Sequence, residues 1–416
     1  MNTINDELKN NPFVGEWLEA LGKMEEKNPA YKEQLDYFCN LGMRRINALF
    51  RGFIKPKVIF VGTDFPLEIA STICPDAFYV LGGSHVLASQ ADNDMPKDSD
   101  AESKSILAYL TEEKWNIAEN AMIVIPMVND SLRKLSYILS ASHDVVSFEV
   151  PSQRNSPEDF EIWNNEMHRV IHTICRKEHT LLFSWKLKKN CRIFNESRIL
   201  MQALEQCNGF LGEDSRLTSD AVLYIKESFL YAKDKEEWNE HLQRLVDELN
   251  EGRKVSVKPS RPEILLLGSS VIAPTYKIPA VFDELEINIR KCIGSLSAVF
   301  DPACLKLNGK LKTTLIRRYY ENNISNAFIS NDFFTKKVVE EMELHKVDGI
   351  VFLIIKGQTG WDFDMKKIER LLEQKNIPIF RIETDYNYQD VEQLKIRIEA
   401  FGEMLRHRKA MVTEKL

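Results

Sequence analysis

The chain has 416 residues, of which 44% are hydrophobic and 28% charged, and 55 basic against 62 acidic residues leave a formal net charge of −7. These values are typical of a globular protein of two or three domains. They exclude a disordered chain, a collagen-like repeat and a small disulfide scaffold. The mildly acidic balance also argues against nucleic acid as a partner.

The seven cysteines are scattered along the chain and contain no CxxC spacing. No zinc or ferredoxin-type motif is present, so we predict no metal site and expect reduced, mostly buried thiols. The N-terminus shows no signal-peptide pattern, and the longest apolar stretches, 121–128 and 349–355, are far shorter than the roughly 20 residues that span a bilayer. We therefore expect a cytoplasmic protein that does not contact a membrane.

The first half of the chain shows a helical segment followed by alternating strands and helices. Residues 1–52 have helical apolar spacing, and four short apolar runs then predict strands at 57–62, 77–83, 121–126 and 144–151. Helical patterns separate the last three runs, and the one at 129–141 opens with Asn129-Asp130, a pair suited to capping a helix. This alternation indicates a parallel sheet covered by helices, so 53–208 is assigned to a first α/β lobe with trailing helices.

The strand pattern returns after a helical connector. Residues 157–208 and 214–251 show only helical patterns, and 252–262 is basic and proline-containing, so 209–258 is assigned to a connector and linker. A second α/β lobe, 259–416, is predicted with strands at 263–268, 296–302, 347–355 and 377–383. We expect two similar lobes, each a small parallel sheet flanked by helices in a Rossmann- or flavodoxin-like arrangement, joined by helices.

Ligands of open α/β sheets bind at the carboxyl ends of the strands. Glycines end several predicted strands here, where a tight turn and a close contact with a phosphate or acyl group are both compatible with the pattern. No GxGxxG or P-loop motif supports a dinucleotide or nucleotide site. The residues that we expect to bind substrate follow the strand ends: Thr63, Asp64, Gly268, Ser269, Lys356, Gly357 and Trp361.

Glu68 is the candidate catalytic residue. It follows the first strand closely, where a carboxylate could act as a general base or hold a substrate hydroxyl. It also falls where a helix begins, and a glutamate in the first turn is favoured by the helix dipole. Both interpretations stay open on the sequence alone.

The C-terminal segment carries a family resemblance. Residues 347–350 read VDGI ahead of Lys356-Gly357, 377–386 read IPIFRIETDY, and 393–405 contain QLK, Arg397, EAF and EML. This combination resembles the 2-hydroxyacyl-CoA dehydratase family of the D-component type, which includes the benzoyl-CoA reductase subunits. The resemblance is strong over 260–405 and looser over 55–210, where Pro66, Glu68 and the segment IPMVNDS match weaker motifs.

The resemblance implies two α/β lobes around a cleft and two homologous subunits that work together. It implies a [4Fe–4S] cluster bound by three cysteines. One iron of this cluster has an open coordination position, which binds the thioester carbonyl of an acyl-CoA. It also implies a separate ATP-hydrolysing activator that supplies one electron. The resulting ketyl radical permits loss of the hydroxyl group, as in a lyase of anaerobic metabolism, or dearomatisation in the reductase branch.

The three cysteine positions of the family hold other residues in this chain. Asn129 and Gln358 stand where two cysteines are expected. The interval 82–120 should hold the third, yet it contains no cysteine and offers only Asp98, Asp100 and Ser103. Amide and carboxylate groups are poor ligands for iron that prefers thiolate. We therefore treat Asp100, Asn129 and Gln358 as degenerate ligand positions and expect no cofactor on this chain.

Three functional interpretations follow from the resemblance. The first is a subunit of a 2-hydroxyacyl-CoA dehydratase or benzoyl-CoA reductase-type complex that has no cluster of its own. It would contribute scaffold and part of an acyl-CoA cleft, with a homologous cysteine-bearing subunit carrying the [4Fe–4S] cluster. The second is a non-catalytic acyl-CoA-binding or regulatory homodimer, and the third an active iron–sulfur enzyme with displaced ligands. In each case Gln358 is expected in an exposed loop.

Overall fold

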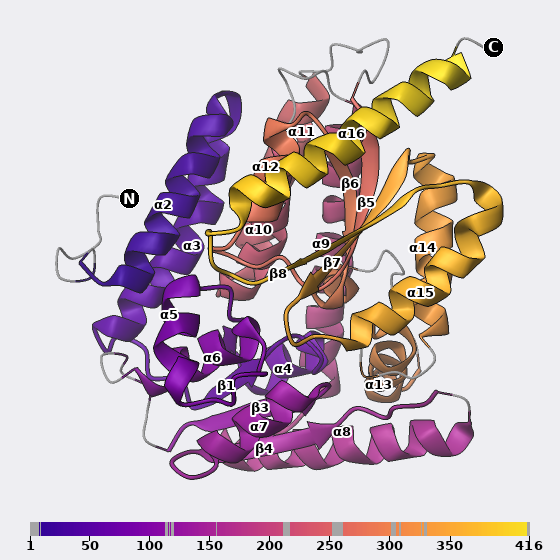
Figure 1. Cartoon of the computed structure of the whole chain (residues 1–416). Helices are drawn as coiled ribbons and strands as arrows, with labels where there is room; N and C mark the ends of the chain where they lie inside the picture. Colours follow the sequence, from indigo (N-terminus) through magenta and orange to yellow (C-terminus); the bar gives the residue numbers. More distant parts are fainter. Residues whose placement is uncertain are drawn as a thin grey trace.

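The computed structural model describes residues 8, 10–112, 115, 117, 120–154, 156–210, 217–251, 261–300, 305–307, 309–325, 327 and 331–413. It contains two four-stranded parallel sheets, with strand orders β2-β1-β3-β4 and β6-β5-β7-β8 (Figure 1). The order within the two sheets is the same, which confirms the predicted pair of similar α/β lobes. Their strands are β1 Val58–Val61, β2 Phe78–Val80, β3 Met122–Met127, β4 Asp144–Glu149, β5 Glu263–Gly268, β6 Asn288–Ile293, β7 Gly349–Ile355 and β8 Ile379–Thr384.

The first lobe is covered by helices on both faces. Strands β1 and β3 lie in the middle of its sheet and every residue of each is buried, which explains why both read as continuous apolar runs. The N-terminal helices α2 and α3 stand beside this sheet, and α8 runs along its far side (Figure 1). The helices of this region are α2 Pro12–Lys27, α3 Lys32–Phe50, α4 Leu67–Ile73, α5 His85–Gln90, α6 Ala101–Thr111 and α7 Asp130–Leu139.

Long helices connect the lobes, as the sequence predicted. They are α8 Pro157–Lys177, α9 Ser184–Phe210, α10 Ser219–Tyr231 and α11 Lys235–Glu251, with α13 Leu311–Asn322 packed beside them. The indole of Trp163 on α8 donates to the carbonyl of Ile316 on α13 at 2.9 Å, so the connector is held to a later part of the chain. Of the predicted linker 252–262, all but 261–262 lie outside the described residues.

The second lobe buries its sheet between two pairs of helices. Strand β7 lies between β5 and β8, and all seven of its residues are buried. Phe334 and Trp361 pack on one face of the sheet, and Phe282 and Phe401 pack on the other. The helices that carry them are α12 Lys277–Glu284, α14 Asp332–His345, α15 Gly360–Leu372 and α16 Val391–Thr413. Among the described helices, none is both long and apolar enough to cross a bilayer.

One predicted strand of the second lobe is wrong. The apolar run at 296–302 forms no strand in its described part, because Ser295–Phe300 is a short 3₁₀ helix whose Val299 and Phe300 are buried. The edge strand is β6, which precedes it. Five of its six residues are only partly buried, because an edge strand pairs on one side only. A search for apolar runs therefore missed it.

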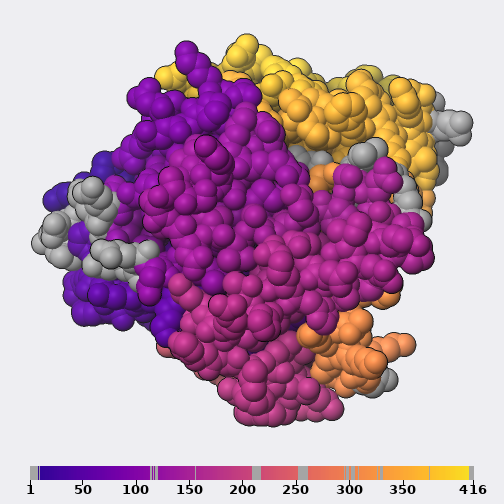
Figure 2. All heavy atoms as spheres, turned by 90° about the horizontal axis from the view of Figure 1, so that it is seen from below, coloured from indigo at the N-terminus to yellow at the C-terminus, as the bar shows by residue number. Residues whose placement is uncertain are grey.

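Seen from below, the two lobes share a long border. Purple and magenta atoms of the first lobe and of α8 cover most of this face, and the yellow atoms of the second lobe lie against them along the upper edge (Figure 2). Residues that are far apart in the sequence thus meet where the lobes adjoin.

Candidate functional site

An open cavity lies between the lobes, where the strands of both sheets end, and its atom-free space, counting the solvent at its mouth, is about 610 Å³. Its walls come from the loops after β1, β3, β5 and β7 and from the first turns of α6, α7 and α15. Thr63, Asp64 and Trp361 line it, and so do two of the degenerate ligand positions, Asn129 and Gln358. Ligand sites of parallel sheets form at the strand ends. Several predicted strand-end residues do meet here, although they come from distant parts of the chain.

Asp100 caps helix α6 and is not among the residues that line this cavity. Its Oδ1 atom accepts a hydrogen bond from the Ser103 amide at 2.7 Å, and its own amide donates to the Ser131 hydroxyl at 3.0 Å. Gly357 approaches it closely, because a β-carbon on that glycine would lie 3.0 Å from the Asp100 nitrogen. The loop after β7 therefore packs on the start of α6.

Asn129 serves as the corresponding cap of helix α7. Its Oδ1 atom accepts from the Leu132 amide at 2.8 Å, so the cap expected at Asn129-Asp130 is formed by the asparagine. Side-chain oxygens at this position satisfy amides that have no partner within the helix. Asp100 and Asn129 are thus engaged in helix capping.

Gln358 joins the two lobes. Its amide Nε2 donates to Oε2 of Glu102 on α6 at 2.9 Å, and the residue is only 5% exposed. The expectation of an exposed loop is therefore wrong, because the first lobe covers the loop after β7. Gln358 links positions that are 256 residues apart in the sequence.

Glu102 is a cavity residue that the sequence analysis missed. Burial raises its pKa to about 8, and the negative charges of Asp100 and Asp64 add to the effect. Burial also raises the pKa of Asp64, which accepts a hydrogen bond from the Asn323 side chain at 3.0 Å. No lysine, arginine or histidine is among the described residues that line this cavity. Its chemistry suits a neutral polar group better than an anion.

We expect Glu102→Gln to change how stability depends on pH. The folded pKa of Glu102, about 8, lies above its ordinary value of 4.5, so the folded state keeps a proton that the unfolded state releases. The free energy of unfolding therefore falls as pH rises between these values, by less than about 1.4 kcal/mol per pH unit. Glutamine mimics the protonated form and removes this part of the slope.

Urea unfolding of both proteins at several pH values between 5 and 8 measures the difference. Glu161→Gln, at an exposed position on α8, is the matched control and should leave the slope unchanged. Parallel pH profiles for the original protein and Glu102→Gln would contradict the protonated state of Glu102.

The residues of this site do not fit a [4Fe–4S] cluster. None of the described residues that line the cavity is a cysteine, and the described residues contain no group of three or more His, Cys, Asp or Glu side chains arranged to hold a metal. Six cysteines are described, all free, and Cys39, Cys74, Cys191 and Cys207 are buried. Cys304 lies outside the described residues. Carboxylate and amide groups are poor ligands for iron that prefers thiolate.

Glu68 lies outside the cavity lining, in a buried ion pair. Arg198 on α9 donates to its Oε1 at 2.5 Å, and the Tyr319 hydroxyl donates to its Oε2 at 2.9 Å. Burial acts to raise the pKa of Glu68, but the charges of Arg198 and Arg318 outweigh it and hold the pKa below its ordinary value. This geometry favours a structural role. A catalytic role for Glu68 stays a prediction.

The other predicted substrate residues lie near the cavity without lining it. Gly268 has a φ of +103°, and the Ser269 hydroxyl accepts from the Ile355 amide at 2.9 Å, which joins the ends of β5 and β7. Lys356 points to solvent and pairs with Asp385 at 3.3 Å. Gly357 gives the loop its close approach to α6. These residues shape the loops around the cavity.

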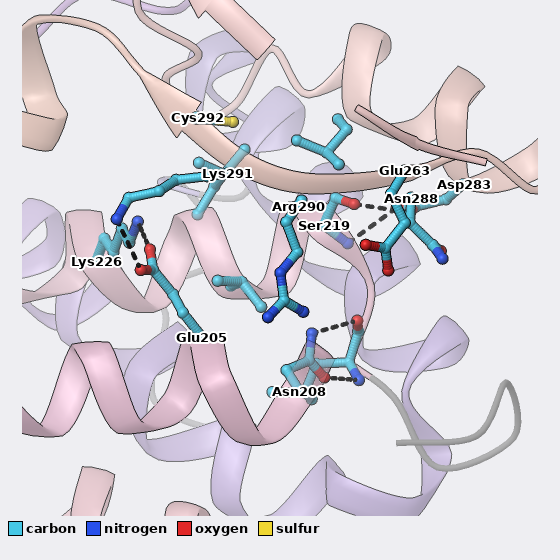
Figure 3. Close-up of a pocket in the computed structure, with 14 residues that line it drawn as sticks. Glu205, Asn208, Ser219, Lys226, Glu263, Asp283, Asn288, Arg290, Lys291 and Cys292 are labelled. Atoms are coloured by element: carbon cyan, nitrogen blue, oxygen red, sulfur yellow. Dashed lines mark hydrogen bonds and ion pairs between the residues drawn. The ribbon is translucent and has the colours of Figure 1, made fainter. Parts of the chain in front are cut away.

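A second pocket, of about 590 Å³, lies between α9, α10 and β6. Lys226 and Lys291 point toward Glu205 (Figure 3). Lys226 forms an ion pair with Glu205, while Lys291 lies 3.6 Å from Glu205 and 2.8 Å from Glu341. Because these charges compensate one another, the pocket is typical of a packing interface, here between the connector helices and the second lobe.

Comparisons with known proteins agree with the resemblance found in the sequence. Residues 56–405 match the family described as 2-hydroxyglutaryl-CoA dehydratase, D-component. The chain is 23% identical over 352 residues to the putative dehydratase subunit YjiM of Escherichia coli (strain K12). This alignment covers 82% of this chain and 90% of the relative. It is also 23% identical over 263 residues to the (R)-phenyllactyl-CoA dehydratase beta subunit of Clostridium sporogenes, covering 62% of this chain and 67% of the relative.

Proposed function

Because this chain belongs to the 2-hydroxyglutaryl-CoA dehydratase D-component family, we propose that it is a subunit of a 2-hydroxyacyl-CoA dehydratase-type complex that carries no cluster of its own. A homologous subunit with the cysteine ligands holds the [4Fe–4S] cluster, and an ATP-hydrolysing activator serves the complex. This chain supplies scaffold and binds the thioester end of an acyl-CoA in the cavity between its lobes.

One observation carries the proposal. Two of the three positions that the resemblance assigns to cluster ligands, Asn129 and Gln358, line this cavity, and the third, Asp100, caps helix α6 next to it. Asp100 and Asn129 cap helices, and Gln358 bonds to Glu102. Side chains that take part in the protein's own hydrogen bonds at these positions support a chain without a cluster. The open cavity beside them supports binding of the thioester.

The chemistry of the cavity supports the thioester end as its occupant. A neutral carbonyl accepts hydrogen bonds, and a protonated Glu102 is a donor at the wall of the cavity. The phosphates of CoA are anions, and the described lining offers no lysine, arginine or histidine to pair with them, so they are expected outside the cavity. The acyl-CoA substrate of the phenyllactyl-CoA dehydratase relative is in keeping with this class of ligand.

The test begins with iron and acid-labile sulfide in the chain purified without oxygen. We expect neither, and we expect the chain to form a stable complex when produced together with a cysteine-bearing homologous subunit. That complex should contain the iron and bind an acyl-CoA. The composition of the complex is read from its native mass, and binding from titration calorimetry with phenyllactyl-CoA.

Two results would overturn the proposal in different ways. About four irons in the isolated chain would favour an active iron–sulfur enzyme with displaced ligands. A chain that forms no complex with the cysteine-bearing subunit, forms only homodimers and binds the acyl-CoA would favour the regulatory homodimer.

A further inference from the structure

The open cavity between the lobes has two acidic side chains at its wall, Asp64 and Glu102, and both are partly buried. No lysine, arginine or histidine is among the described residues that line it. Whether protonated or ionised, a carboxyl group cannot compensate a negative charge on a ligand. A carboxylate that leaves water needs such compensation. The lining is therefore unfavourable for an acyl group that ends in a second carboxylate.

The lysines on the neighbouring elements are engaged in ion pairs. Lys104 on α6 pairs with Asp92 at 2.8 Å, and Lys134 on α7 pairs with Asp98 at 2.9 Å. Lys356, in the loop after β7, pairs with an aspartate as described above. None of these three lysines lines the cavity. A carboxylate bound in the cavity would thus gain no positive partner from these elements unless an existing ion pair were broken.

Apolar side chains from both lobes form much of the remaining wall. Leu81, Val128 and Leu132 come from the first lobe, and Ile272 and Leu296 come from the second. The other polar side chains of the described lining carry hydroxyl or amide groups. A wall of this composition is typical of a site for an uncharged organic group. Only the acyl end of the thioester has to enter, because the phosphates of CoA are expected outside.

We infer that this cavity accepts uncharged acyl groups and discriminates against acyl groups that end in a carboxylate. The inference rests on the proposed binding of an acyl-CoA thioester between the lobes, and it adds the class of acyl group. It separates this chain from the substrate in the description of its family. The acyl group of 2-hydroxyglutaryl-CoA ends in a second carboxylate.

Titration calorimetry of the full chain at pH 7 tests the inference with three thioesters of similar length. They are 2-hydroxypentanoyl-CoA, 2-hydroxyglutaryl-CoA and the terminal amide of 2-hydroxyglutaryl-CoA, and free CoA measures the contribution of the carrier. We expect the pentanoyl thioester and the amide to bind more tightly than free CoA. Binding of 2-hydroxyglutaryl-CoA should be weaker than binding of the amide by about tenfold or more, because the amide has nearly the same shape without the charge.

Failure of the inference differs from failure of the proposed function. If all three thioesters bind equally well and more tightly than free CoA, acyl-CoA binding stands and the discrimination is wrong. If none of them binds more tightly than free CoA, the proposed binding of the thioester is overturned, and the inference fails with it.

Val128→Lys tests whether the discrimination arises in this cavity. Val128 is partly buried in the loop after β3, and lysine adds a cation there on a flexible stem. We expect binding of 2-hydroxyglutaryl-CoA to strengthen by about fivefold or more, with no such gain for the amide. Ile162→Lys, at an exposed position on α8, is the control for added charge and should leave both affinities unchanged.

Unchanged discrimination in a folded Val128→Lys protein overturns the assignment to this cavity. If circular dichroism shows that this variant does not fold, Leu296→Lys decides by the same comparison of acid and amide. Leu296 is a partly buried lining residue of the second lobe, so its replacement brings the cation to the same cavity from the other side.

Discussion

Replacing Arg198 with methionine is expected to lower the free energy of unfolding by about 3–5 kcal/mol. Arg198 is 1% exposed and Glu68 is fully buried. The guanidinium also donates through Nε to the Val299 carbonyl at 3.1 Å, so it holds α9 to α4 and to the 3₁₀ helix. Without Arg198, the carboxylate of Glu68 is left in the core with its main compensating charge removed.

A double variant separates the ion pair from simple loss of packing. Glu68→Gln combined with Arg198→Met leaves no buried charge at either position, and we expect it to recover a large part of the lost stability in urea unfolding. Arg133→Met is the surface control. Arg133 and Glu149 are both about half exposed, so breaking that pair should cost less than about 1 kcal/mol. Equal losses for Arg198→Met and Arg133→Met would show that burial adds nothing to the Glu68 pair.

Glu227→Leu is expected to destabilise the protein by about 3 kcal/mol or more. The side chain is fully buried on α10, and it accepts from the Ala273 amide at 2.8 Å, the Tyr276 hydroxyl at 3.0 Å and the Tyr231 hydroxyl at 2.6 Å. Leucine removes the acceptor of all three donors, and each buried donor left unmatched costs about 1–3 kcal/mol.

The effect should reach the cavity between the lobes. Ala273 belongs to the loop after β5, which supplies Ser270 and Ile272 to that cavity. Hydrogen exchange of residues 269–276 should therefore become faster in Glu227→Leu, while exchange of β1 and β3 follows only the global loss of stability. Glu227→Gln keeps one acceptor oxygen and should cost clearly less. If glutamine and leucine have the same effect, the three hydrogen bonds contribute little.

The fold was predictable where burial is complete. Strands β1, β3, β5 and β7 lie in the middle of their sheets and are apolar apart from Glu263 at the start of β5, so each was found within one or two residues. Strand β6 was missed because Asn288, Arg290 and Lys291 interrupt its apolar residues, whereas the other edge strands, β2, β4 and β8, were predicted. The family was recognised from its C-terminal motifs, and the match over residues 56–405 confirms it.

The site was predictable only in part, for a physical reason. Strand-end residues such as Thr63 and Gln358 follow from the topology of a parallel sheet. Glu102 does not, because its role arises from a hydrogen bond across 256 residues of sequence. The pairing of Glu68 with Arg198 likewise spans 130 residues. No local pattern marks such contacts, since either residue alone reads as an ordinary helix position.

The helix caps at Asp100 and Asn129 also set a cost for placing cysteine at either position. Aspartate and asparagine are among the best residues at the start of a helix, and their replacement by a poor cap costs about 1 kcal/mol each. A cluster needs all of its thiolate ligands at once. We therefore expect a variant with cysteine at only one of these positions to have a weaker helix start and no metal site, so that a cluster could be designed into this fold only by changing all of the positions together.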